Sequence, residues 1–156
     1  MRILVLFLLL PLFLSATPTA QQFEGWRGIT PLRSSVSGVR AKLGKPSDRG
    51  VASELYILSD FKVNIRYSAG PCKPPFATWN VKKGTVLTIL VVPLVQTPFD
   101  IKASGTTTFE RAIKDDLSIE YTNLRDGIKY TVSPDGNVSS ILFTPPDRRR
   151  SQFACK

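Results

Sequence analysis

Residues 61–67 read FKVNIRY, and this stretch alternates apolar and polar side chains without a break. A period of two is typical of a β-strand with one buried and one solvent-facing side. The apolar run 55–58 precedes it, and Ser59 and Asp60 leave room only for a tight connection. The sequence therefore predicts an antiparallel hairpin over residues 55–67.

Further strands are predicted after this hairpin. Residues 79–81 form a short candidate, and the almost continuously apolar run 86–92 indicates a central strand covered on both faces. Three more antiparallel strands are predicted at 117–122, 127–132 and 138–143, which are rich in β-formers and separated by turn residues. Residues 94–117 leave two alternatives open, a short helix capped by Thr108 and ending at Ile113, or a strand with a loop.

One helix is predicted before the hairpin. Apolar side chains recur at spacings of three and four over residues 36–43, after Ser34 or Ser35 as N-cap and before Gly44 and Pro46 as a stop. Together with the strands, this helix predicts an α+β fold. We expect an antiparallel β-sheet with one or two short helices packed on one face, and one disulfide.

The N-terminal segment has the pattern of a secretory signal peptide. Arg2 is followed by an apolar run from residue 3 to residue 14 and then by small residues, with Ala20 or Ala16 before the cleavage point. The run is too short for the roughly 20 residues that span a bilayer. We therefore expect residues 1–20 to be a signal peptide and residues 21–156 to be a single globular domain, secreted or located in the periplasm or cell envelope.

The composition narrows the chemistry that this protein can perform. The 156 residues contain no His, and 21 Lys plus Arg stand against 12 Asp plus Glu. The commonest general base and the usual zinc ligand are therefore missing. Removing residues 1–20 takes away one Arg and lowers the net charge from +9 to +8. We expect no metal and no cofactor.

Cys72 and Cys155 are the two cysteines of the chain. In an exported protein such a pair predicts one structural disulfide, which would join the C-terminal tail to the loop before residue 79. A redox role would require a Cys-x-x-Cys pair, and the sequence has none.

Two sequence motifs suggest catalysis or phosphate binding, but their position or spacing does not fit these functions. Residues 59–62 match S-x-x-K but join two predicted strands, and residues 38–45 imitate a phosphate-binding loop with a spacer one residue too long, so we expect no nucleotide. The densest acidic group, Asp115, Asp116 and Glu120, is typical of a solvated turn. A hydrolase acting on RNA or glycans would instead need a cleft lined by a buried carboxylate and two Arg.

Arg148, Arg149 and Arg150 form the sharpest run of positive charge. With the net charge, this run could attract an anionic polymer or an anionic membrane surface. The alternative is a solvated basic tail, because no aromatic residues suited to base stacking are interleaved with the three Arg.

The run 26–34, WRGITPLRS, leads into Val39 and the sequence LGKP at 43–46. This box resembles the opening W-x-G-I-x-P-L-x-S of an uncharacterised family of small exported bacterial proteins that end in a Cys. Further matching positions are Tyr67, Cys72, Trp79, Val81, Gly84, Thr85, Val86, Tyr121, Asn123, Gly127, Ile128 and Tyr130. That family brings no known activity.

The helix that ends in LGKP and precedes a hairpin is also similar to the SmpA/OmlA outer-membrane lipoproteins and to β-lactamase inhibitor proteins. Members of both groups work by binding, and this sequence lacks the lipidated Cys of the lipoproteins. The resemblance implies a helix-plus-antiparallel-sheet unit and no catalytic residues.

These observations favour an exported, non-enzymatic module that binds a protein partner. Its contact would use a sheet face or the segment 26–34, with Trp26 and Arg33 as candidate binding residues. For these two residues the alternative is a lead-in packed on the core that carries a surface charge. The alternative functions are a small secreted hydrolase that uses carboxylates and Arg, and a basic binder of anionic polymers or membrane surfaces.

Overall fold

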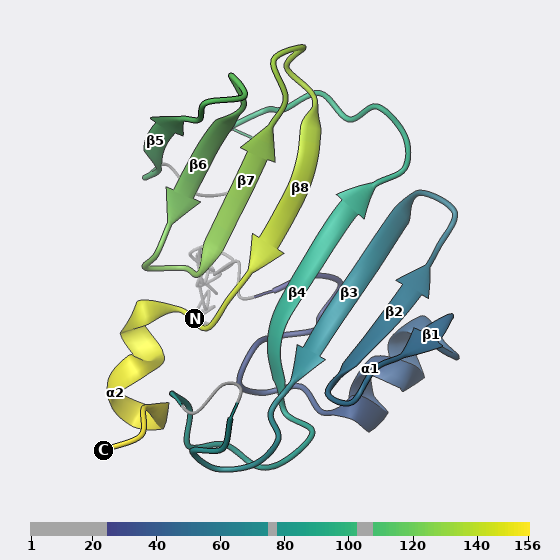
Figure 1. Ribbon diagram of the computed structural model, residues 1–156, viewed down its shortest axis with the longest axis vertical. Coiled ribbons are helices and arrows are strands. Elements are labelled where there is room, and N and C mark those ends of the chain that lie inside the picture. Colours follow the sequence, from purple (N-terminus) through teal and green to yellow (C-terminus); the bar gives the residue numbers. More distant parts are fainter. Residues whose placement is uncertain (1–24, 75–77, 103–107) are drawn as a thin grey trace, which may run out of the picture.

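The computed structural model describes residues 25–74, 78–102 and 108–156, so the expected signal peptide lies outside the described residues. In this part of the chain eight strands form one antiparallel sheet in the order β1-β2-β3-β4-β8-β7-β6-β5 (Figure 1). The strands are β1 (Asp48–Arg49), β2 (Ser53–Ile57), β3 (Phe61–Tyr67), β4 (Val86–Pro93), β5 (Glu110–Ile113), β6 (Ile119–Asn123), β7 (Ile128–Val132) and β8 (Val138–Phe143).

The helices are short. They are α1 (Val36–Leu43), the 3₁₀ helix η1 (Asp147–Arg149) and α2 (Arg150–Phe153). The predicted helix α1 is confirmed, and Ser35 is its N-cap, with a side chain that accepts a hydrogen bond from the Gly38 amide at 3.2 Å. Gly44 ends the helix with φ 81°, a conformation that suits glycine. The C-terminal tail also contains η1 and α2, which the sequence pattern does not predict.

The predicted hairpin is confirmed as β2 and β3. Tyr56 pairs with Val63 and Ile57 with Lys62. Because side chains alternate between the faces of a strand, Val63, Ile65 and Tyr67 are buried on the covered face. The short strand expected at 79–81 is reduced to an isolated bridge between Trp79 and Ala154.

Strand β4 is central, as predicted, but the prediction that it is covered on both faces holds only at its start, where Val86 and Leu87 are buried in two different clusters. Ile89 and Val91 are fully buried, whereas Leu90 is 36% exposed. The apolar run in β4 therefore contains two kinds of position, those that fill the core and those that lie on an open face of the sheet.

The second half of the sheet is a meander of β6, β7 and β8 with β5 at its edge. Of the two alternatives for residues 108–113 the strand is the correct one, because Glu110–Ile113 pairs with β6. Phe99 and Phe109 precede this strand and pack against the covered face. The Phe99 ring stacks on Tyr121 at 4.5 Å, and Phe109 contacts Tyr130 with ring centroids 5.8 Å apart.

The expectation of an α+β fold is wrong. The molecule is dominated by a single eight-stranded sheet, and its two short helices do not form a layer. The reason is that β5–β8 extend the first four strands edge to edge through the pairing of β4 with β8. Helix α1 and loop residues such as Phe99 and Phe109 together cover one face of the sheet.

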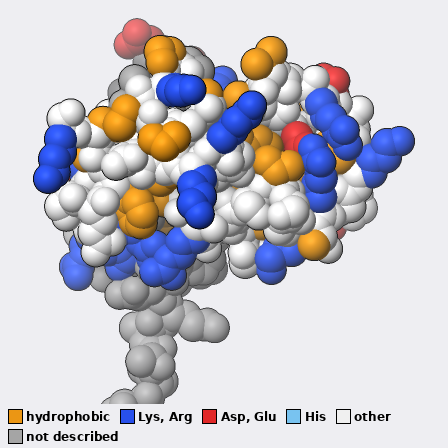
Figure 2. Space-filling model, turned by 90° about the horizontal axis from the view of Figure 1, so that it is seen from below, with side chains coloured by type: hydrophobic (Ala, Val, Ile, Leu, Met, Phe, Trp, Pro, Cys, Tyr) orange, Lys and Arg blue, Asp and Glu red, His pale blue; other side chains and the backbone are white. Residues whose placement is uncertain are grey.

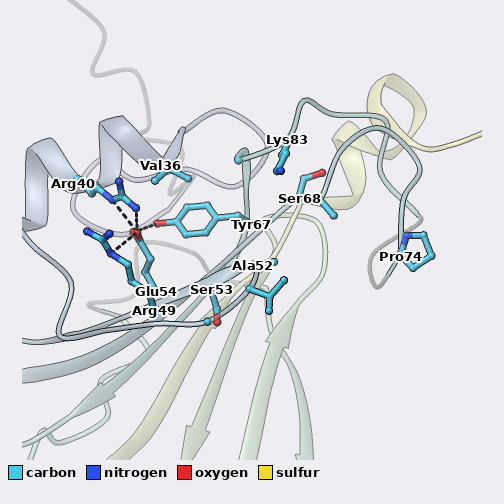
Figure 3. Close-up of a pocket in the computed structure, with 14 residues that line it drawn as sticks. Val36, Arg40, Arg49, Ala52, Ser53, Glu54, Tyr67, Ser68, Pro74 and Lys83 are labelled. Atoms are coloured by element: carbon cyan, nitrogen blue, oxygen red, sulfur yellow. Dashed lines mark hydrogen bonds and ion pairs between the residues drawn. The ribbon is translucent and has the colours of Figure 1, made fainter.

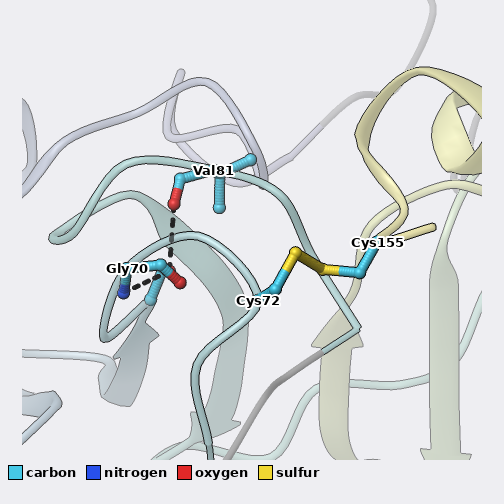
Figure 4. The surroundings of a disulfide bond; sticks show 5 residues. Gly70, Cys72, Val81 and Cys155 are labelled. Carbon is cyan, nitrogen blue, oxygen red and sulfur yellow. Dashed lines mark hydrogen bonds between the residues drawn. A yellow bond between two sulfur atoms is a disulfide. The ribbon is translucent and has the colours of Figure 1, made fainter.

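The predicted disulfide between Cys72 and Cys155 is confirmed, with Cα atoms 5.7 Å apart (Figure 4). Backbone hydrogen bonds reinforce it, from the Cys72 amide to the Trp79 carbonyl and from the Cys155 amide to the Thr78 carbonyl. Nearby, Phe153 of α2 packs on the small buried cluster of Leu32, Val81 and Leu87. The bridge thus ties the tail to the loops at one end of the sheet.

We expect replacement of Cys72 and Cys155 by Ser to lower the free energy of unfolding by about 2 to 4 kcal/mol, because the bridge closes a long loop. Urea unfolding measures this change. Reductant should destabilise the wild-type protein to a similar extent and leave the double variant unaffected. A wild-type unfolding curve that does not move with reductant would contradict the prediction.

Candidate functional site

The structure places Trp26 in a tight turn beside the core. Trp26 and Ile29 exchange both backbone hydrogen bonds, and the two residues between them have positive φ, as a type I′ turn requires. The half-buried Trp26 ring packs edge-on against Phe61, with centroids 5.8 Å apart, and Arg27 lies over it at 4.8 Å. The ring is therefore engaged in packing, whereas Arg33 is exposed.

The three consecutive Arg have different environments. Arg148 pairs with Asp126 at 3.7 Å, and Arg149 is buried. Arg150 is 69% exposed and lies 3.4 Å from Asp147. This run is therefore not a uniform basic patch. Figure 2 shows Lys and Arg side chains scattered over the visible part of the lower face of the molecule, with hydrophobic and a few acidic side chains between them.

The acidic group around residue 116 belongs to a turn. Asp116 accepts hydrogen bonds from the amide and hydroxyl of Ser118 at 3.0 and 2.6 Å, and these bonds lower its pKa. Glu120 lies between Lys114 at 2.8 Å and Lys129 at 2.9 Å. Asp115 and Asp116 therefore form the expected exposed turn, whereas Glu120 lies on β6 with a side chain that is 19% exposed and paired with the two lysines.

The most densely bonded ionisable group is Glu54, which the sequence analysis missed. It projects from β2 onto the covered face, and its side chain is 4% exposed. One carboxylate oxygen accepts a hydrogen bond from Arg40 Nε at 2.9 Å and a second, shorter one from Arg40 Nη2. The other accepts from the hydroxyls of Tyr56 at 2.7 Å and Tyr67 at 2.8 Å. The carboxylate thus links α1 to β2 and β3.

Two opposing effects act on the pKa of Glu54. Burial alone would raise this pKa, but the hydrogen bonds from Arg40, Tyr56 and Tyr67 outweigh burial and hold it below its ordinary value. Burial and the bond to the carboxylate raise the pKa of Tyr56 to about 12, and the same causes raise that of Tyr67. At neutral pH Glu54 is therefore an anion and both tyrosines are hydrogen-bond donors.

A pocket of about 360 Å³ lies beside this network (Figure 3). Arg40 and Arg49 meet at Glu54 at one end, and Lys83 and Ser68 lie at the other. The pocket meets the composition required of a hydrolase, one buried carboxylate and two Arg. However, both oxygens of Glu54 already accept hydrogen bonds, and the low pKa leaves no proton to donate at neutral pH. This arrangement binds and orients better than it transfers protons.

A second hollow, of about 660 Å³, lies on the open face of the sheet. It is lined by Leu55, Lys62, Asn64, Arg66, Thr88, Leu90, Val92 and Leu142. The strand register sets Leu55, Asn64, Leu90 and Leu142 side by side in one row across four strands. Lys62 lies on one side of this row and Arg66 on the other. The row between the two positive charges is therefore apolar at Leu55, Leu90 and Leu142 and polar at Asn64.

The described residues contain neither a cluster suited to a metal ion nor a membrane-spanning helix. Among residues 25–74, 78–102 and 108–156, no group of three or more carboxylate or Cys side chains could hold a metal ion. In the same ranges, no helix is long and apolar enough to cross a membrane.

Replacement of Glu54 by Gln is expected to lower the free energy of unfolding by about 2 to 4 kcal/mol, because two buried tyrosine hydroxyls lose a charged acceptor. Urea unfolding measures the loss. Glu110 on the edge strand is a matched control, since it is exposed and its change to Gln should cost less than about 0.5 kcal/mol. Equal effects of the two substitutions would show that the network is not stabilising.

The stability of the protein should also depend on pH through Glu54. Its pKa is lowered from 4.5, so the stabilisation is complete above that pH and is lost as the pH falls through the lowered pKa. We expect the free energy of unfolding to decline below pH 4.5 and to decline less steeply in Glu54→Gln. Other carboxylates contribute equally in both proteins, so parallel curves would contradict this assignment.

Comparisons with known proteins leave the family open. No family model matches the sequence, and no curated protein matches it. Among solved structures, the chain is similar to the crystal structure of a DUF4309 family protein, YjgB, from Bacillus subtilis. The two share 12% sequence identity, with a TM-score of 0.44, over 76% of this chain and 82% of that one. The chain is not assigned to that family at this level of similarity.

Proposed function

We propose that this protein is an exported, non-enzymatic binding module, and that the open face of its sheet binds a segment of a partner protein that carries acidic and apolar side chains. The observation that carries the proposal is the apolar row across β2, β4 and β8 with Lys62 and Arg66 on its two sides. Export is supported by the Cys72–Cys155 disulfide, since such bonds persist in oxidising compartments.

The apolar content of this face supports a macromolecular partner. Leu90 is 36% exposed at the middle of the sheet, and Ile57, next to Lys62 in the register, is 60% exposed. Apolar side chains grouped on an open sheet face are typical of an interaction surface, whereas scattered ones are ordinary. The hollow therefore provides the apolar contact for a partner.

The charges on this face select the chemistry of that partner. Lys62 and Arg66 are four residues apart on β3 and face the same side, so their Cα atoms are about 13 Å apart. An extended segment has the same spacing between its first and fifth residues. A segment with acidic residues at these positions and an apolar residue at the third would set its charges near Lys62 and Arg66 and its apolar side chain over Asn64, beside Leu90.

We expect an extended peptide with this acid-x-Leu-x-acid pattern to shift the NMR signals of β2, β3, β4 and β8 in the purified, oxidised protein. Leu90→Asp and Lys62→Glu should each weaken binding about tenfold or more, because they remove an apolar contact or reverse a charge. Leu117→Asp and Lys45→Glu are matched controls at exposed positions away from the hollow and should leave affinity unchanged.

The same peptide with Lys in place of its acidic residues should bind far more weakly. Equal binding of the two peptides, or shifts confined to other parts of the protein, would overturn the proposal. Preferential binding of heparin or anionic vesicles that Lys62→Glu and Lys45→Glu weaken equally would instead favour the basic polymer or membrane binder. Substrate turnover lost in Glu54→Gln would favour the hydrolase.

A further inference from the structure

The pocket beside Glu54 lies on the opposite side of the sheet from the open face. Glu54 and Tyr67 point to the covered face, while their chain neighbours Leu55 and Arg66 line the hollow on the open face. The pocket is formed where the first turn of α1, the start of β2 and the turn before β4 meet. A ligand bound there would leave the open face accessible.

The lining of this pocket carries an excess of positive charge. Arg40, Arg49 and Lys83 line it, and Glu54 is the one acidic residue among the described lining residues. Arg40 already neutralises Glu54 through two hydrogen bonds, and the remaining carboxylate oxygen is held by tyrosine hydroxyls. Arg49 is 55% exposed and its Nε lies 3.9 Å from Glu54, too far for a hydrogen bond. Arg49 and Lys83 therefore give the pocket its positive potential.

The rest of the lining is mostly apolar or small. Val36, Ala52, Pro74 and the ring of Tyr67 contribute to it, with Ser53 and Ser68 as hydroxyl groups. A volume of about 360 Å³ is in the range of small-molecule sites and far below that of a folded protein segment. The pocket thus combines a positive potential with an apolar wall of limited size.

From this combination we infer that the pocket binds a small organic anion, whose charged group interacts with Lys83 and whose apolar part lies against Val36 and Tyr67. Arg49, beside Glu54 at the opposite end of the pocket, adds to the positive potential. The saturated network around Glu54 holds the Tyr67 ring and Arg40 in place before the ligand arrives. Such preorganisation reduces the conformational entropy that binding would otherwise cost.

Benzoate is a suitable probe, and benzamide is its uncharged analogue of nearly the same shape. We expect benzoate at about 10 mM to shift the NMR signals of residues 49–54 and 83–84 in the purified, oxidised protein, and benzamide to bind at least tenfold more weakly. Lys83→Gln should weaken benzoate binding about tenfold, because a charged hydrogen bond is lost. Arg49→Gln should weaken it less, because Arg49 lies at the opposite end of the pocket and contributes only to the potential.

Lys82 provides the matched control, since it is the exposed neighbour of Lys83 and does not line the pocket. Lys82→Gln should change the affinity for benzoate less than twofold, and urea unfolding should show that all three variants are folded. Equal binding of benzamide, equal effects of Lys82→Gln and Lys83→Gln, or no shifts at the pocket would each overturn the inference.

Benzoate binding at the pocket can be tested independently of peptide binding on the open face. Leu90→Asp should weaken peptide binding about tenfold or more and leave benzoate binding intact. Lys83→Gln should weaken benzoate binding and leave peptide binding intact. A protein that binds the peptide and not benzoate would refute this inference alone.

Discussion

The pairing of β4 with β8 is the contact on which the single sheet depends. It joins strands that are far apart in the sequence, through the pairs Ile89–Phe143, Leu90–Leu142 and Val91–Ile141. Ile89, Val91 and Phe143 are buried, so this short register makes the cores of the two halves continuous. Phe99 and Phe109, in the described parts of the chain between β4 and β5, pack on this continuous core. The pairing of β4 with β8 therefore gives both halves of the sheet one shared covered face.

The Glu54 network helps to hold helix α1 on the covered face of the sheet. Helix α1 has only eight residues, and within its apolar stripe Val39 is fully buried, whereas Val36 and Leu43 are half-buried. Arg40 on this helix reaches Glu54 on β2, which also accepts hydrogen bonds from Tyr67 on β3. A buried charge is costly unless it is paired, and here both oxygens of the carboxylate accept hydrogen bonds. The network thus fixes the position of a helix that packing alone would hold weakly.

The spacing of apolar side chains along the sequence was sufficient to predict those strands and helices in which it repeats regularly. Residues 61–67 and 36–43 formed the predicted strand and helix, and the position of Gly44 marked the helix end. The run 86–92 misled, because apolar residues on the open face of a strand look the same in sequence as those in a core. The fold class was wrong for a related reason, since the β4–β8 pairing is a long-range contact without a local signature.

The Glu54 site was missed because the predicted strand began two residues too late. With a start at Leu55, Glu54 belonged to the preceding polar stretch, and no face could be assigned to it. A start at Ser53 puts Glu54 on the same face as Tyr56, and the hairpin register then adds Tyr67. An acidic residue on the apolar face of a strand, next to two tyrosines, was the available signal. Partners from another element, such as Arg40, still required the tertiary structure.

The two proposed sites follow from one property of β2 and β3. Glu54 and Leu55 are adjacent in the chain, as are Tyr67 and Arg66, yet each pair divides between opposite faces. A one-residue shift in the pairing of these strands would exchange the faces, burying Leu55 and exposing Glu54. The carboxylate network penalises such a shift, because Glu54 would lose its tyrosine donors and Arg40 would lose its acceptor. Glu54, which positions the pocket on the covered face, therefore also maintains the pattern of apolar and basic side chains on the open face.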